Sequence, residues 1–351
     1  MAEHGSEGVA FKARVDRILA SFVDQEVGQL TAIDEQLTPL ATQLCAVTLE
    51  GKRLRAAFCY WGWRAAGQPD CDEMVRAAAA MELVHAAAVV HDDLIDNSPV
   101  RRGAPAAHIA LQGALTGRTG RQAGGRALAM LAGDLLMSWA GQLFTSCGLP
   151  ASYLARARPM WAVLARELIA GEALEILRTG SRPYARSSLQ VIRYKTAKYT
   201  VEHPLHIGGR LGGGPPALFE VFSAYGLPLG EAFQLRDDLL GIFGDPEVTG
   251  KSNMDDLVGH KPTTLLAATW ASADTAERKV LGALLGRRTL DQEGLDQVRD
   301  IMRRTGAVGQ IEDLIAERVQ AATAAIVRAG LPAPAAAALT GLVGSAVVRQ
   351  S

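Results

Sequence analysis

The sequence predicts an all-α fold in one domain that spans residues 1–351. Apolar residues recur at steps of three and four along most of the chain, which is the spacing of one face of a helix. The alternating pattern of half-buried strands is absent, and no linker or internal repeat divides the sequence. Hydrophobic residues make up 48% of the chain, which is enough for a sizeable core. Helices with apolar faces bury those faces against one another.

Composition limits the partners and the compartment. The net charge of −1 gives no general positive field for nucleic acid or for an anionic membrane. The first residues lack the basic and apolar regions of a signal peptide. The apolar run at residues 77–90 contains Glu82 and His85 and is too short to span a bilayer. We therefore expect a cytoplasmic protein with no transmembrane segment and no nucleic-acid partner.

The first elements are helical. Residues 1–8 are polar and are expected to be frayed, and residues 9–47 carry the apolar spacing of one or two helices. Residues 51–55 then read GKRLR, with basic side chains after a glycine at the start of a helix expected to reach Ala66. Backbone N–H groups at a helix start favour an anion, and Lys and Arg strengthen that preference. A diphosphate cradle and a solvated basic turn both fit these residues.

The next helix, expected from Asp72 to Asp96, carries the stretch around which the chain is organised. Its Ala-rich run ends in Asp92, Asp93 and Asp96. Asp92 and Asp96 are four residues apart, so they share one helix face, where like charges repel. Oxygen ligands favour Mg²⁺, which binds through one or two carboxylates plus the phosphates of a substrate. A solvated helix end with chance acidic residues is the alternative.

A loop and further helices follow. Residues 97–126 are rich in Gly, Arg and Pro and are expected to form a mobile loop. Helices are expected at residues 128–145, 159–177 and 187–211, and the Ala-rich residues 265–351 are expected to be helical scaffold. Asp134 lies inside the first of these helices, where a hydrogen bond between helices is a simpler role than catalysis.

The helix expected at residues 218–243 repeats the acidic pattern. Asp237 and Asp238 end its apolar run, and Asp245 begins a second loop, residues 245–262, that is also expected to be mobile. Two acidic helix faces, each followed by basic residues, can face each other across one cavity. Such an arrangement would hold a polyanion through metal ions bound to both carboxylate clusters.

Together, these motifs resemble those of the trans-isoprenyl diphosphate synthases, the polyprenyl synthetase family, from about Gly51 to Thr264. The family's first motif, DDxxD, is matched in full by residues 92–96. The second is matched in part, because Gly241 stands where the last Asp usually is. The resemblance implies an isoprenoid-synthase-like helical bundle around a central cavity, Mg²⁺ as the cofactor with three ions per active site, and a homodimer. It also implies that isopentenyl diphosphate condenses with an allylic diphosphate and that pyrophosphate is released.

The resemblance assigns roles residue by residue. Asp92, Asp96, Asp237 and Asp238 would bind metal, with Asp93 in the same catalytic cluster. Isopentenyl diphosphate would be held by Lys52, Arg55, His85 and Arg102. Arg101, Lys195, Lys251 and Lys261 would act on diphosphate at the allylic side, and Thr196 and Gln234 match neighbouring family positions.

The resemblance also indicates where product length is set. In members that stop at fifteen carbons, a bulky aromatic usually stands four or five residues before the first motif, where this chain has Ala88 and Ala87. One helical turn is about 5.4 Å, on the order of one isoprene unit. Val84 lies two turns before Asp92, and Met81, three turns before it, is the first large side chain. This predicts the twenty-carbon geranylgeranyl diphosphate, with farnesyl or longer polyprenyl products as alternatives.

Two other functions stay open. A class I terpene cyclase shares the metal-assisted ionisation, but its second motif combines Asn or Asp with Ser or Thr and Glu. Here Asp237, Asp238 and two lysine-bearing loops stand in that place. A non-catalytic subunit of a heteromeric synthase typically loses the first motif, which this chain keeps. The sequence shows no Ser–His–Asp or Cys–His arrangement that would suggest a protein nucleophile.

Overall fold

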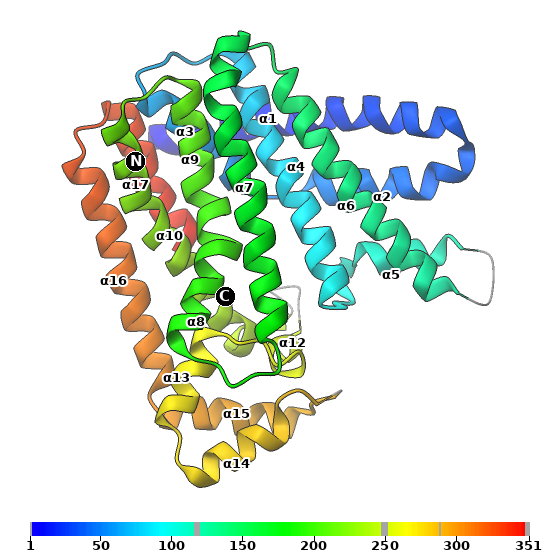
Figure 1. Ribbon diagram of the computed structural model, residues 1–351, viewed down its shortest axis with the longest axis vertical. Coiled ribbons are helices and arrows are strands. Elements are labelled where there is room, and N and C mark those ends of the chain that lie inside the picture. The colour runs from blue at the N-terminus through cyan, green and yellow to red at the C-terminus, as the bar shows by residue number, and fades with distance from the viewer. Residues whose placement is uncertain (1, 116–119, 247–251, 288, 348–351) are drawn as a thin grey trace. The chain divides into compact units, whose positions relative to one another are not determined.

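The computed structural model describes residues 2–115, 120–246, 252–287 and 289–347 (Figure 1). The all-α prediction is confirmed, because long helices build the fold. The strands in the described residues form one short hairpin of β1 (Val100–Arg101) and β2 (Ala104–Pro105). The chain gathers into two compact units, Met1–Arg158 with Pro204–Gly214 and Pro159–His203 with Pro215–Ser351. The single domain expected from the sequence stays a prediction.

The first unit is built around α4 (Asp72–Ile95). The hairpin also lies in it, and the other helices that lie wholly in it are α1 (Ala2–Ile33), η1 (Glu35–Leu37), α2 (Thr38–Leu49), α3 (Leu54–Ala65), α5 (Ala107–Gly113) and α6 (Arg121–Thr145). Residues 77–80 of α4 are all alanines with no exposed surface. These small side chains let neighbouring helices approach closely, and α6 runs side by side with α4 (Figure 1).

Two helices cross the boundary between the units. These are α7 (Ala151–Arg178) and α9 (His203–Leu211). In the first unit, α9 touches α3 backbone to backbone, because a Cβ on Gly208 would lie 1.8 Å from the carbonyl oxygen of Cys59. Only glycine fits such a contact.

The second unit is built around α10 (Pro216–Phe243), which packs against η2 (Ile192–Glu202) and α16 (Ala307–Arg328). Its other described elements are α8 (Ala185–Val191), α12 (Asp255–Val258), α13 (Thr264–Ser272), α14 (Thr275–Leu284), α15 (Gln292–Arg304) and α17 (Ala333–Val347). The hydroxyl of buried Tyr225 donates to the carbonyl oxygen of Leu339 at 2.8 Å and so ties α10 to α17.

The helix expected at residues 187–211 is divided, because its middle part, η2, is a π-helix. Such a segment has bonds to the fifth preceding residue and often marks a functional site. A Cβ on Gly230 would lie 2.4 Å from the Cα atom of Ala197, and a Cβ on Gly171 would lie 2.3 Å from the backbone nitrogen of Lys195. The backbone of η2 is therefore in close contact with both α10 and α7.

The expected loops contain more regular structure than the sequence indicates. Residues 2–8, expected to be frayed, belong to α1. The region 97–126 contains the hairpin, α5 and the start of α6. Here the buried Ala107 and Leu111 supply the apolar face that holds α5 in place. The second loop contains α12. The mobility of both regions stays a prediction.

Two helices, α4 and α6, are long and apolar enough to cross a membrane by length and composition alone. In α4, 72% of the most apolar window is buried inside the protein. That burial is the setting of a core helix, so the composition of α4 follows from its place at the centre of the first unit.

Candidate active site

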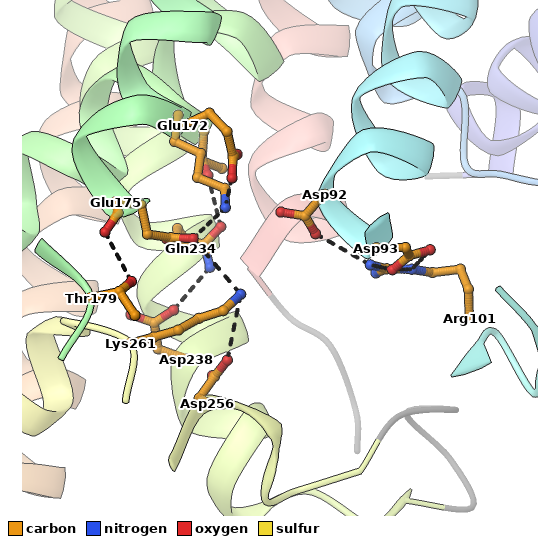
Figure 2. Close-up of polar contacts among 12 residues, drawn as sticks. Asp92, Asp93, Arg101, Glu172, Glu175, Thr179, Gln234, Asp238, Asp256 and Lys261 are labelled. Carbon is orange, nitrogen blue, oxygen red and sulfur yellow. Dashed lines mark hydrogen bonds and ion pairs between the residues drawn. The ribbon is translucent and has the colours of Figure 1, made fainter. Parts of the chain in front are cut away.

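The first acidic motif lies at the C-terminal end of α4. Asp93 is buried with 2% exposure, and the guanidinium of Arg101 donates to both of its carboxylate oxygens. Arg101 also donates to Asp92 at 3.3 Å (Figure 2). Burial alone would lower the pKa of Arg101, but its hydrogen bond and attraction to Asp93 raise that pKa. Carboxylates are unfavourable at a helix C-terminus, so the charge of Arg101 compensates them.

The hairpin places the two arginines. Its loop is Arg102-Gly103, with φ angles of 52° and 76°, as in the tight turns that suit antiparallel strands. Arg101 returns to α4, whereas Arg102 donates to the carbonyl oxygen of Glu50 at 2.8 Å. In the first unit, Arg101 therefore binds the acidic motif and Arg102 binds the basic turn.

The basic turn joins α2 to α3. Lys52 is exposed and Arg55, in the first turn of α3, is buried with 7% exposure. Burial lowers the pKa of half-buried His85 well below its ordinary value, and the nearby charges of Arg55 and Arg102 lower it further. His85 is therefore neutral near pH 7, and the turn gathers cations that an anion would balance.

The second acidic motif lies in α10 of the second unit. The carboxyl of Asp238 has 6% exposure, and burial together with the charges of Asp256 and Asp237 raises its pKa to about 8. Gln234 donates to Asp238 at 2.9 Å (Figure 2). The same amide accepts from the hydroxyl of Thr196 at 2.8 Å. This chain of hydrogen bonds links Thr196 of η2, which follows Lys195, to the acidic motif of α10.

Two glutamates of α7 belong to the same cluster. The ammonium of Lys195 lies 2.5 Å from a carboxylate oxygen of Glu175 and 3.0 Å from one of Glu172. Lys261 lies 3.8 Å from Glu175 and 4.0 Å from Asp256 (Figure 2). Sequence reasoning predicted the helix but missed both glutamates. Their spacing of three residues, which gives one helix face, was the available signal.

The donor atoms in each unit fit a hard divalent cation, because they are carboxylate oxygens. In the second unit, the raised pKa of Asp238 reflects a buried carboxylate beside other negative charges. A cation would relieve this repulsion. Lys251, expected to act on diphosphate, lies outside the described residues.

Other residues of interest lie on the faces of α4. The ring Nε2 of His91 is 3.2 Å from the carbonyl oxygen of Met130 and 3.6 Å from the carboxylate of Asp134, which fits a contact between helices α4 and α6. The residues expected to set product length are Met81, Val84 and Ala87, which are fully buried, and Ala88, which is half-buried.

Comparison with known proteins identifies the family. Residues 38–302 match the model of the polyprenyl synthetase family. A (2E,6E)-farnesyl diphosphate synthase of Mycobacterium tuberculosis is 32% identical over 86% of this chain and 80% of its own. A geranylgeranyl diphosphate synthase of Saccharolobus solfataricus is 29% identical over 73% of this chain and 74% of its own.

A solved structure supports the same conclusion. The geranylgeranyl pyrophosphate synthase of Corynebacterium glutamicum, complexed with isoprenyl diphosphate and magnesium, has a TM-score of 0.91 and 32% identity. The match covers 97% of this chain and 99% of that one. Relatives with different products are thus about equally similar. This chain belongs to the polyprenyl synthetase family and is a trans-prenyl diphosphate synthase, a prenyltransferase.

Proposed function

We propose that this synthase condenses isopentenyl diphosphate with dimethylallyl, geranyl and farnesyl diphosphates and releases geranylgeranyl diphosphate. The observation that carries the product length is Ala88. It is half-buried on α4, one turn before Asp92, where family members that stop at fifteen carbons carry an aromatic. Two turns before Asp92 stands Val84, which is also not aromatic. In this proposal, the growing chain runs along α4 from Asp92 past Ala88 as far as Met81.

Isopentenyl diphosphate binds, in this proposal, at the basic turn of the first unit. Lys52, Arg55 and Arg102 supply positive charge, and arginine can bind two phosphate oxygens at once. Burial keeps His85 neutral by lowering its pKa, and the nearby guanidinium groups lower that pKa further. A neutral imidazole can donate one hydrogen bond to a phosphate oxygen without a change of charge.

The allylic diphosphate needs its leaving charge neutralised. The ligands for Mg²⁺ would be Asp92 and Asp96 in the first unit, and Asp237 and Asp238 in the second. When bound, Mg²⁺ supplies Lewis-acid stabilisation of the departing diphosphate, and we propose three ions per active site. Lys195, Arg101, Lys251 and Lys261 add fixed positive charge. In the described structure Lys195 is already held by Glu172 and Glu175, which fix the direction of its ammonium.

The proposal is tested by incubating the pure protein with Mg²⁺, isopentenyl diphosphate and each allylic starter, and then identifying the products. Geranylgeranyl diphosphate from all three starters is expected, and chelation of the metal should abolish it. A terpene cyclase would instead release a hydrocarbon or alcohol from the allylic substrate alone. A non-catalytic subunit would turn over nothing without a partner chain.

A homodimer in the cytoplasm is also part of the proposal, on the strength of the family resemblance. Light scattering at micromolar concentration should give twice the mass of one chain. A fully active monomer would refute the dimer.

A further inference from the structure

Arg53 is a buried arginine at the centre of the basic turn. Its side chain is 4% exposed. One terminal nitrogen donates to the carbonyl oxygens of Thr48 and Leu49 at 2.9 and 2.8 Å, at the end of α2. The other donates to the carbonyl oxygen of Glu50 at 3.3 Å. The carbonyl groups at the end of a helix have no partners inside it, so Arg53 caps α2 with its side chain.

The backbone of Arg53 is constrained as well. Its φ of 56° lies in the left-handed region, which residues other than glycine rarely adopt. Such a residue keeps this conformation only where its surroundings fix it. Arg53 is also the residue before α3, so its conformation directs the chain from Lys52 on one side into Arg55 on the other.

Two further contacts tie Arg53 to its neighbours. Its Nε donates to the carboxylate of Asp16 in α1 at 2.7 Å. Burial alone would raise the pKa of Asp16, but hydrogen bonds from Lys12 and Arg53 outweigh it and lower that pKa. Asp16 therefore stays charged. On the other side, the carbonyl group of Glu50 accepts from both Arg53 and Arg102, so the two arginines share one anchor.

We propose that Arg53 and Asp16 are positioning residues for isopentenyl diphosphate. The pair fixes the turn that directs Lys52 and Arg55, and it holds the Glu50 carbonyl group that orients Arg102. The hydrogen bonds of Arg53 go to protein atoms, so Arg53 acts on the substrate through these neighbours. The inference rests on the proposed function, because it takes the basic turn as the site for isopentenyl diphosphate.

The variants Arg53→Lys and Asp16→Asn test this proposal. Lysine keeps the charge but loses the planar fork that reaches three carbonyl groups and a carboxylate. Asparagine keeps the shape of Asp16 and loses its charge. The control removes a charge from the same helix, α1: Arg14→Gln breaks the ion pairs with Asp70 and Asp72.

We expect Arg53→Lys and Asp16→Asn to raise the KM for isopentenyl diphosphate about tenfold, the size of one lost charged hydrogen bond. The KM for the allylic starter should change less than twofold, and the Arg14→Gln control should match the wild type. Equal increases in both KM values, or a fall in kcat alone, would show a general structural role and overturn the proposal. If Arg53→Lys lowers the melting temperature strongly, Asp16→Asn decides by the same criterion.

A second measurement separates positioning from general weakening. In the Arg55→Gln background, Arg53→Lys should raise the KM for isopentenyl diphosphate by less than it does in the wild type. The reason is that Arg55, one of the residues that Arg53 positions, is already absent. Full additivity would contradict the proposal. Calorimetric titration of the unmodified protein with isopentenyl diphosphate tests the proposed function itself. If it does not bind, the proposed function fails. If it binds but the Arg53 variants bind equally well, only the positioning role fails.

Discussion

The carboxylate of Asp256 lies against Gly241, the last position of the second acidic motif. A Cβ on Gly241 would lie 3.0 Å from the Oδ2 of Asp256, a distance tighter than ordinary contact. Gly241 is where family members usually carry the third aspartate of this motif. In this chain, a carboxylate from α12 therefore lies against the position where that aspartate would begin. Asp256 is also one cause of the raised pKa of Asp238.

The first prediction follows from this contact. Restoring the family residue with Gly241→Asp should lower kcat about tenfold, because a second carboxylate meets that of Asp256 and displaces α12. The double variant Gly241→Asp with Asp256→Ala should recover most of the loss. Steady-state kinetics over a range of Mg²⁺ concentrations measures both. If Gly241→Asp alone is as active as the wild type, the space is not occupied as described.

A second prediction concerns the aspartates of α10. Asp237→Ala should cost far more activity than Asp245→Ala, because we assign the remaining metal to Asp237, supported by Asp238. The same assay measures both variants. Equal losses would mean that Asp237 is not the ligand at the first position of the motif.

The third prediction concerns the first acidic motif. Asp92→Ala should cut turnover roughly a hundredfold or more through loss of a metal ligand, and should leave the melting temperature nearly unchanged. Asp134→Ala is the matched control, since it removes the same charge from an exposed position in the same unit. Turnover and circular dichroism are measured together. An Asp92→Ala variant with near-normal turnover would refute the metal assignment.

The fourth prediction is a pH dependence of stability. His85 lies among Arg55, Arg102, Arg101 and Arg53, and its pKa is well below the ordinary value of 6.5. Below pH 6.5 the unfolded chain binds a proton here that the folded chain does not, so stability falls as the pH drops through this window. His85→Gln should recover about 1 kcal/mol of unfolding free energy at pH 5.5. Above pH 7, the variant and the wild type should show the same dependence on pH.

Denaturant titrations in the presence of a chelator measure this effect. The carboxyl of Asp238 changes stability with pH in the opposite direction to His85. Its pKa of about 8 means that the folded chain keeps a proton that the unfolded chain releases near pH 4. Its contribution to stability is therefore lost as the pH rises towards 8. Asp238→Asn should remove the fall in unfolding free energy between about pH 4 and pH 8, and should leave the pH dependence that arises from His85 unchanged. A His85→Gln variant as acid-sensitive as the wild type would contradict the burial of a neutral imidazole.

The sequence predicted most helices because their apolar faces repeat, and it predicted the two acidic motifs because these end apolar runs. It did not predict the π-helix around Lys195, since bonds to the fifth preceding residue leave no periodic pattern of residues. Nor did it find Glu172, Glu175 or the place of Asp256. Spacing along one helix shows which side chains share a face. It does not show which element packs against that face. That pairing depends on close contacts between distant residues, such as those of Gly171 with Lys195 and of Gly241 with Asp256.

The last prediction is the product length, and the structure separates two substitutions that the sequence treats alike. Ala88 is half-buried and lies one turn before Asp92, so a larger side chain there projects along the face that carries the motif. Ala87 has no exposed surface, and a phenylalanine there would overpack the contact of α4 with its neighbours. Ala88→Phe should therefore shift the main product towards fifteen carbons with little change in melting temperature.

Ala87→Phe should lower the melting temperature, at a cost of about 1–3 kcal/mol, whatever it does to the product. Chromatography of the dephosphorylated products, with the melting temperature of each variant measured alongside, separates the two effects. Ala88→Leu, which adds bulk without an aromatic ring, is the graded control and should shorten the product less. A wild type that already stops at fifteen carbons would defeat the argument. So would an Ala88→Phe variant that folds normally and still releases the twenty-carbon product, because the growing chain would then run along another face.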